Sequence, residues 1–511
     1  MRLGLQSPAM APNILSIPPG RPFLKTLAAG LLSGRIVESF RYDGDPLALA
    51  GVTVYVPSRR AARSLSSAFT QVLGERFGVR SAILPKIRPI GEGDEAAIFA
   101  TRESSAGTML PAMPELERRL ALARLARQWR RLAESAATAA LSGEPAEALS
   151  ERPASAAEAL ALAGDLGTLL DEIETEGTSF AKLAGLAPDA LAAWWQTTLS
   201  FLEIVTEHWP EHLKQRGVTS EAAAKNVWLR SEAARLLSGE AKGPVILAGS
   251  TATAPATLDL MHAVANLAEG ALVLPGLDRH IGEVGFAAID RDVSIAAPGH
   301  PQYGLKRILT RFALPPEAVR HLDEDLSPAL ARREAFLASA LRPAETTALW
   351  AEEAPAFGRD ALGREVLDDV ALIEAGEPRI EALAIAAAMR EALEQPEAKV
   401  ALITPDRRLA RRVLAELERF GITANDSAGR PLGTTAPGKL LSAALKVALE
   451  PGDPVALLGL LKHPLCRLGC KAIDARNAAR AIELIAIRGT VDVADGARLG
   501  EIVNRRIEAI E

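Results

Sequence analysis

The chain has 511 residues, so it is expected to form several domains. Its content of 48% hydrophobic and 24% charged residues excludes a disordered or collagen-like protein. A net charge of −6 argues against a surface that is basic throughout, while leaving room for a local basic groove. Two cysteines cannot build a disulfide framework or supply the four thiolates of an iron–sulfur cluster. No apolar run approaches the length of a bilayer span and no secretion signal is evident, so we expect a cytoplasmic protein without a membrane partner.

Short apolar runs alternate with helical patterns at the start of the chain, which predicts a parallel α/β sheet. Ser58 is a plausible N-cap for the helix that follows the second run. The expected elements are a strand at Asn13–Ile17, a helix at Phe23–Leu32, a strand at Gly51–Val56, a helix at Arg59–Gly74 and a strand at Ser81–Leu84.

A long helical block follows, and the α/β pattern then returns with strands at 244–249 and 271–274. We therefore expect the block to be inserted into the α/β domain. A helix at 379–394, a strand at 399–404 and a helix at 407–420 predict a second α/β core. The expected division is 1–113 and 244–325 for the two parts of the first core, 114–243 for the helical insertion, 326–378 for a linker, 379–437 for the start of the second core, and 438–511 for an incomplete helical insertion in it.

The loop after the first strand occupies the position of a phosphate-binding loop but lacks its chemistry. Such a loop needs glycines, a lysine and a Ser/Thr that holds magnesium. Gly20, Arg21, Lys25 and Thr26 are present, but prolines at 18, 19 and 22 remove three amide donors. We interpret it as a degenerate nucleotide loop.

Two further features argue against an ATP-driven motor. Gly433–Lys439 fits G-x-x-x-x-G-K, but Leu440 replaces the magnesium-binding hydroxyl and no clear strand leads into the segment. Ala248 and Gly249 follow the strand at 244–247, where a motor needs acidic residues. No spacing of histidine, cysteine or carboxylate side chains indicates a catalytic nucleophile or a metal site, so we predict no catalytic residues and no metal in this chain.

Basic side chains gather at predicted junctions between strands and helices. Arg59, Arg60 and Arg63 occupy the first turns of a helix, where positive charge opposes the helix dipole, and this local cost favours a binding role. Lys86 and Arg88 are expected to follow the third strand in a comparable place. All five are candidate contacts to the phosphate backbone of DNA.

An α/β core with a helical insertion, followed by a second α/β core, resembles superfamily 1 helicases. An ordered set of segments narrows the resemblance to the AddB family of double-strand break repair proteins, of the alphaproteobacterial type. The segments are Asn13–Thr26, Val52–Arg63, Ile83–Glu95, Val245–Pro255, Val273–Leu277, His300–Arg307, Ala401–Arg412 and Asp426–Leu432.

The resemblance implies two RecA-like parallel-sheet cores with large helical insertions. It also implies a heterodimer with AddA, an ATP-using helicase–nuclease that acts on single-stranded and double-stranded DNA ends. Family members carry a carboxy-terminal PD-(D/E)xK nuclease with magnesium and an iron–sulfur cluster. That part is expected beyond Glu511, so this chain is expected to be a fragment that has no cofactor of its own.

The leading hypothesis is a non-motor, helicase-like DNA-binding subunit of an AddAB-type enzyme. Two alternatives stay open at this stage. One is an active ATP-dependent motor that uses Gly433–Lys439. The other is a scaffold that docks AddA without binding DNA.

Overall fold

The computed structural model describes residues 11–79, 81–91, 110–139, 155–179, 202, 204–251, 254–323, 326–358, 365–368, 370–488 and 496–509. The chain forms two compact units, residues 1–369 and residues 370–511. Within the described residues, no helix is both long and apolar enough to cross a membrane.

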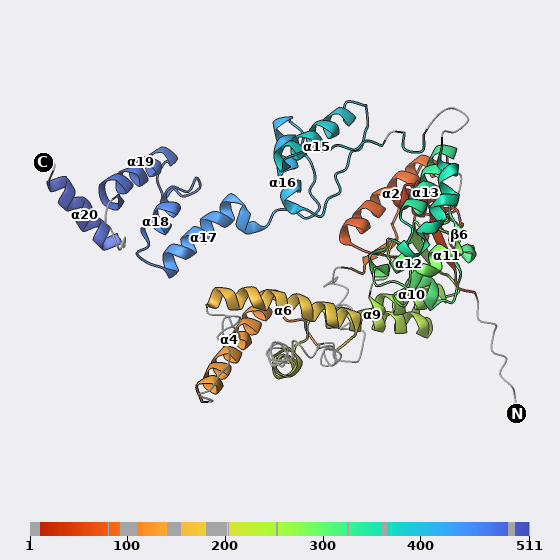
Figure 1. Cartoon of the computed structure of the whole chain (residues 1–511), viewed down its shortest axis with the longest axis horizontal. Helices are drawn as coiled ribbons and strands as arrows, with labels where there is room; N and C mark the ends of the chain where they lie inside the picture. The colour runs from red at the N-terminus through yellow and green to blue at the C-terminus, as the bar shows by residue number, and fades with distance from the viewer. Residues whose placement is uncertain are drawn as a thin grey trace. The chain divides into compact units, whose positions relative to one another are not determined.

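The first unit is built on a six-stranded, all-parallel sheet, which confirms the predicted α/β class (Figure 1). The strand order is β3-β2-β4-β5-β1-β6. Because all strands are parallel, the loops that follow them meet at one edge of the sheet, the carboxyl edge. The strands are β1 (Ile14–Ile17), β2 (Thr53–Val56), β3 (Lys86–Pro89), β4 (Val245–Ala248), β5 (Gly270–Pro275) and β6 (Arg320–His321).

The central strands are buried on both faces, because their side chains alternate between two hydrophobic cores. On one face, Leu15, Val54 and Val273 pack with α1 (Phe23–Leu32) and α2 (Arg59–Phe77). The opposite face carries four further helices. These are α9 (Glu221–Arg235), α10 (Pro255–Ala265), α11 (Gly282–Ala288) and α12 (Tyr303–Arg311).

Between β3 and β4 the chain forms helices that carry their own small core. Leu122 and Trp209 are buried there, between α4 (Glu115–Ala139), α6 (Ala156–Glu176) and α8 (Trp209–Arg216). Ser155 and Glu158 form a capping box at the start of α6. Helix α9 contacts both α6 and α10, so it connects the inserted block to the sheet domain.

A buried carboxylate on α9 reinforces this connection. Glu232 is 2% exposed and accepts a hydrogen bond from the Tyr55 hydroxyl of β2. It also pairs with Arg88 of β3 at 3.2 Å and with Arg235 at 2.8 Å. Burial by itself favours the neutral acid, but the hydrogen bonds from Arg235 and Tyr55 outweigh it and lower the pKa of Glu232. Burial and the Glu232 charge raise the pKa of Tyr55.

We predict that Glu232→Gln lowers the free energy of unfolding by about 2 kcal/mol at pH 7, because it removes one charge from a buried network whose arginines keep access to water. The lowered pKa means that this contribution is fully present above the ordinary glutamate pKa and disappears as the pH falls through the folded-state value. Urea unfolding at several pH values should therefore show the two proteins converging below about pH 4. The exposed Glu172→Gln in α6 is the matched control, and an equal effect there would contradict the prediction.

The third strand differs from its predicted position. Ser81–Leu84 is not a strand, and β3 is Lys86–Pro89 instead. The prediction missed β3 because β3 lies at the edge of the sheet. A strand there pairs on one side only and tolerates charged side chains. The sequence Lys-Ile-Arg-Pro therefore lacks the continuous apolar character of a central strand.

The range expected to be a linker, 326–378, is largely helical up to residue 358. It contains α13 (Pro328–Ala340), a 3₁₀ turn (Ala344–Leu349) and α14 (Trp350–Glu353), all within the first unit. Buried Arg342 fixes the segment to the sheet domain by donating to the backbone oxygen of Ile281 at 3.0 Å and pairing with Glu353.

The second unit contains no strand in its described residues, 370–488 and 496–509, so the predicted second parallel sheet is not formed there. The residues at 399–404, expected to form a strand, have no regular secondary structure, and Ile403 is 94% exposed. Its helices are α15 (Pro378–Ala392), α16 (Arg407–Arg419), α17 (Ala436–Leu449), α18 (Pro454–Leu461), α19 (Ala472–Ile482) and α20 (Gly496–Glu508). The first two pack through Ala382, Ala386, Val413 and Leu417.

Candidate functional site

The degenerate nucleotide loop folds as a tight turn between β1 and α1. The Arg21 amide donates to the backbone oxygen of Pro18 at 3.1 Å, and its guanidinium Nε donates to the backbone oxygen of Asp323 at 3.0 Å. A Cβ added at Gly20 would lie 3.1 Å from the Leu326 side chain. With three prolines in the turn and a leucine against its glycine, the loop does not provide a ring of free amides for a phosphate.

An aromatic ring occupies the adjacent part of the carboxyl edge. The ring of Phe23, the first residue of α1, lies 3.2 Å from the position of a Cβ on Gly249, just after β4. Pro57, after β2, lies 3.7 Å from the same position. Gly249 has a φ of +76°, which a residue with a side chain adopts at a cost. The loops after β1, β2 and β4 thus meet in an apolar contact where a motor would need charged residues.

Lys25 and Thr26 do not reach this edge as their counterparts in a phosphate loop would. The Lys25 ammonium lies 2.9 Å from a carboxylate oxygen of Glu75, and hydrogen bonds from Lys25 and Gln71 lower the pKa of Glu75. Glu75 stands about 24 Å along α2 from Arg59 at 1.5 Å per residue. Thr26 is 5% exposed within α1.

The three arginines at the start of α2 lie where the sequence predicted them. Ser58 caps the helix by accepting from the Ala61 amide at 3.2 Å. Arg59, Arg60 and Arg63 are exposed in the first two turns, and the first turn contains no acidic residue. The guanidinium charges and the amino end of the helix dipole therefore add at the carboxyl edge of the sheet.

Lys86 and Arg88 do not join this cluster, because they lie within β3 rather than after it. Lys86 begins the strand and so stands at the amino edge, opposite the arginines of α2. Arg88 is paired with the buried Glu232. The five predicted DNA contacts are therefore reduced to three that share one surface.

Gly433–Lys439 is the start of a helix. The Thr435 hydroxyl accepts from the Gly438 amide at 3.2 Å and caps α17. A Cβ at Gly438 would lie 1.8 Å from the backbone oxygen of Leu432, so this glycine serves close packing. Lys439 is exposed, and a 3₁₀ turn at Leu432–Thr434, rather than a strand, leads into the helix.

Among the residues that the structure describes, no group of three or more His, Cys, Asp or Glu side chains could hold a metal ion. At the start of α2 the carboxyl edge offers exposed guanidinium groups beside a capped helix start, suited to binding an anionic polymer. Sequence reasoning missed the contact between Phe23 and Gly249, for which the glycine after a buried strand was the only available signal.

No protein-family model matches the chain, and no curated protein is significantly similar to it.

We predict that Gly249→Ala lowers the free energy of unfolding by about 2 kcal/mol, because it forces a positive φ on alanine and crowds the Phe23 ring. Urea unfolding measures the change. Gly74→Ala is the control: it lies on the exposed side of α2, its Cβ would have no atom within 4 Å, and it should stabilise by about 0.5 kcal/mol. Equal effects in the two variants would contradict the packing described here.

Proposed function

We propose that the chain is a non-motor, helicase-like DNA-binding subunit of an AddAB-type helicase–nuclease that processes double-strand breaks. The arginine cluster at the start of α2 is the observation that carries the DNA-binding part. The ordered resemblance to the AddB family supplies the process and the partner, AddA. The parallel α/β sheet and its inserted helical block are compatible with that family.

The non-motor part of the proposal rests on the carboxyl edge of the sheet. Prolines and Leu326 fill the turn after β1, and the Phe23 ring packs where β4 ends. Lys25 is paired with Glu75 instead of facing that turn. In this proposal, Arg59, Arg60 and Arg63 bind a strand of DNA and the chain itself does not use ATP. The partner AddA hydrolyses the ATP.

The DNA-binding prediction is tested by removing Arg59, Arg60 and Arg63 together as a triple alanine variant. Fluorescence anisotropy with labelled single-stranded DNA, at several salt concentrations, measures affinity for the chain alone and with AddA. Losing three phosphate contacts should weaken binding and reduce the slope of log K against log[salt] by about 2.

The matched control removes three positive charges from the opposite edge of the sheet. Arg76, Lys86 and Lys242 are exposed at the end of α2, the start of β3 and just before β4. Their triple alanine variant has the same net charge as the test variant. If both variants bind alike, or if wild-type binding does not depend on salt, the arginine cluster does not contact DNA.

ATP turnover tests the non-motor part. We predict that, with single-stranded DNA present, neither Lys25→Ala nor Lys439→Ala reduces the rate of ATP hydrolysis measured for the chain. The reason is that neither lysine stands beside a phosphate-binding loop. Release of radioactive phosphate is the measurement. A rate that either substitution abolishes would establish a motor and overturn this part of the proposal.

A further inference from the structure

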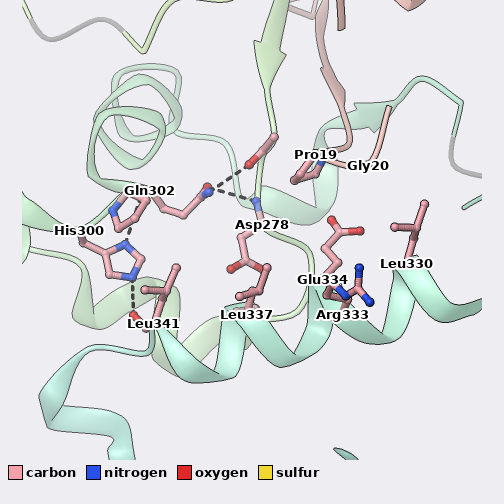
Figure 2. A pocket seen from close by; sticks show the side chains of 13 residues that line it. Pro19, Gly20, Asp278, His300, Gln302, Leu330, Arg333, Glu334, Leu337 and Leu341 are labelled. Atoms are coloured by element: carbon pink, nitrogen blue, oxygen red, sulfur yellow. Dashed lines mark hydrogen bonds between the residues drawn. The ribbon is translucent and has the colours of Figure 1, made fainter. Parts of the chain in front are cut away.

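A cavity of about 350 Å³ lies at the carboxyl edge of the sheet, beside the ends of β1 and β5 (Figure 2). Pro19 and Gly20 line it after β1, and Gly276 and Asp278 line it after β5. Helix α13 and its C-cap residue Leu341 close it with an apolar surface, to which the helix contributes Leu330, Leu337 and Ala338. The volume is at the lower end of the range for small-molecule sites.

The cavity lies between β1 and β5, two neighbouring strands whose connections to the next strand run in opposite directions. From β1 the chain passes through α1 on one face toward β2, whereas from β5 it passes through α11 and α12 on the other face toward β6. In open parallel sheets this crevice, between strands whose connections diverge, is where ligands bind.

Three side chains of the cavity wall donate hydrogen bonds within the protein, and one of them, Arg333, brings a positive charge to the lining. Gln302, His300 and Arg333 donate to backbone oxygens at 3.0, 2.8 and 3.2 Å. Figure 2 shows the hydrogen bonds that His300 and Gln302 form with their neighbours along one side of the cavity.

Two carboxylates also line the cavity. Glu334 on α13 is 10% exposed, and its Oε2 lies 3.2 Å from Nη2 of Arg279. Its Oε1 is buried and has no hydrogen-bond partner among the described residues. Asp278 accepts two backbone amides at one oxygen, 2.7 and 3.0 Å away, and its carboxylate also lines the cavity. An unpaired buried acceptor is unfavourable, so a hydrogen-bond donor placed against Oε1 would be stabilised there.

We propose that this cavity binds a small organic cation, a primary amine carried on an apolar body. The ammonium donates to Oε1 of Glu334, and the apolar body packs on the leucines of α13 and on Pro19. A phosphate or carboxylate in the same place would meet the charges of Glu334 and Asp278. The crevice of this sheet therefore selects for a cation, and this inference does not depend on DNA binding.

Isothermal titration of the full chain with tryptamine and with indole-3-propionate tests the charge preference, because the two probes share a ring and a chain length but carry opposite charges. We expect tryptamine to bind at least about tenfold more tightly, the contribution of one charge-assisted hydrogen bond. ATP should not displace it.

Two variants should change this preference in opposite directions. Glu334→Gln should remove the roughly tenfold advantage of tryptamine, because the amide carries no charge. Arg279→Gln should increase it, because the Glu334 carboxylate then loses its arginine partner and keeps only the more distant His280 ring, 4.0 Å away. A general loss of folding cannot produce opposite shifts, and thermal melting of both variants monitors it. Absence of tryptamine binding at millimolar concentration, equal binding of both probes, or an unchanged preference in Glu334→Gln would overturn the proposal.

Discussion

All-parallel pairing is the constraint on which the rest of the first unit depends. Because every strand enters from the same edge, the segments after β1, β2, β4 and β5 converge on one surface. The central strands β1, β2, β4 and β5 are buried on both faces and offer almost no exposed side chains. Chemistry in such a domain is therefore decided by a few loop residues at the carboxyl edge.

In this chain those loop residues divide the edge into two environments. Next to β2 the start of α2 presents guanidinium groups to solvent beside the amino end of a helix dipole. Next to β1 and β5 the cavity presents acceptors and apolar surface beneath α13. The contact between Phe23 and Gly249 involves residues from the segments after β1 and β4. One edge thus carries exposed positive charge at one end and partly buried carboxylates at the other, although the whole chain carries a net charge of −6.

The burial of each element explains whether its position could be predicted from the sequence. Strand β1 and helix α1 were placed almost to the residue, because an apolar run between prolines has few alternative structures. Edge strand β3 was misplaced because its charged residues do not resemble a buried strand. The strand expected at 399–404 was wrong because an apolar run specifies a strand only when a neighbour supplies the ladder of hydrogen bonds.

The candidate sites, too, were predictable from the sequence in part and not in full. The arginine cluster was predictable, since a capping serine fixes the helix start and the arginines follow it directly in sequence. The separation of Lys86 and Arg88 from that cluster depended on a strand position that the sequence did not specify. The cavity joins Pro19 to Glu334 across more than three hundred residues, and the proline- and alanine-rich segment around α13 resembles a linker. Only the packing of that segment on the sheet, with Gly20 set against Leu330, reveals that a helix covers the turn after β1. A turn closed by proline and leucine side chains exposes few amides to a phosphate, and Pro19, Gly20 and Leu330 of this same arrangement line the cavity.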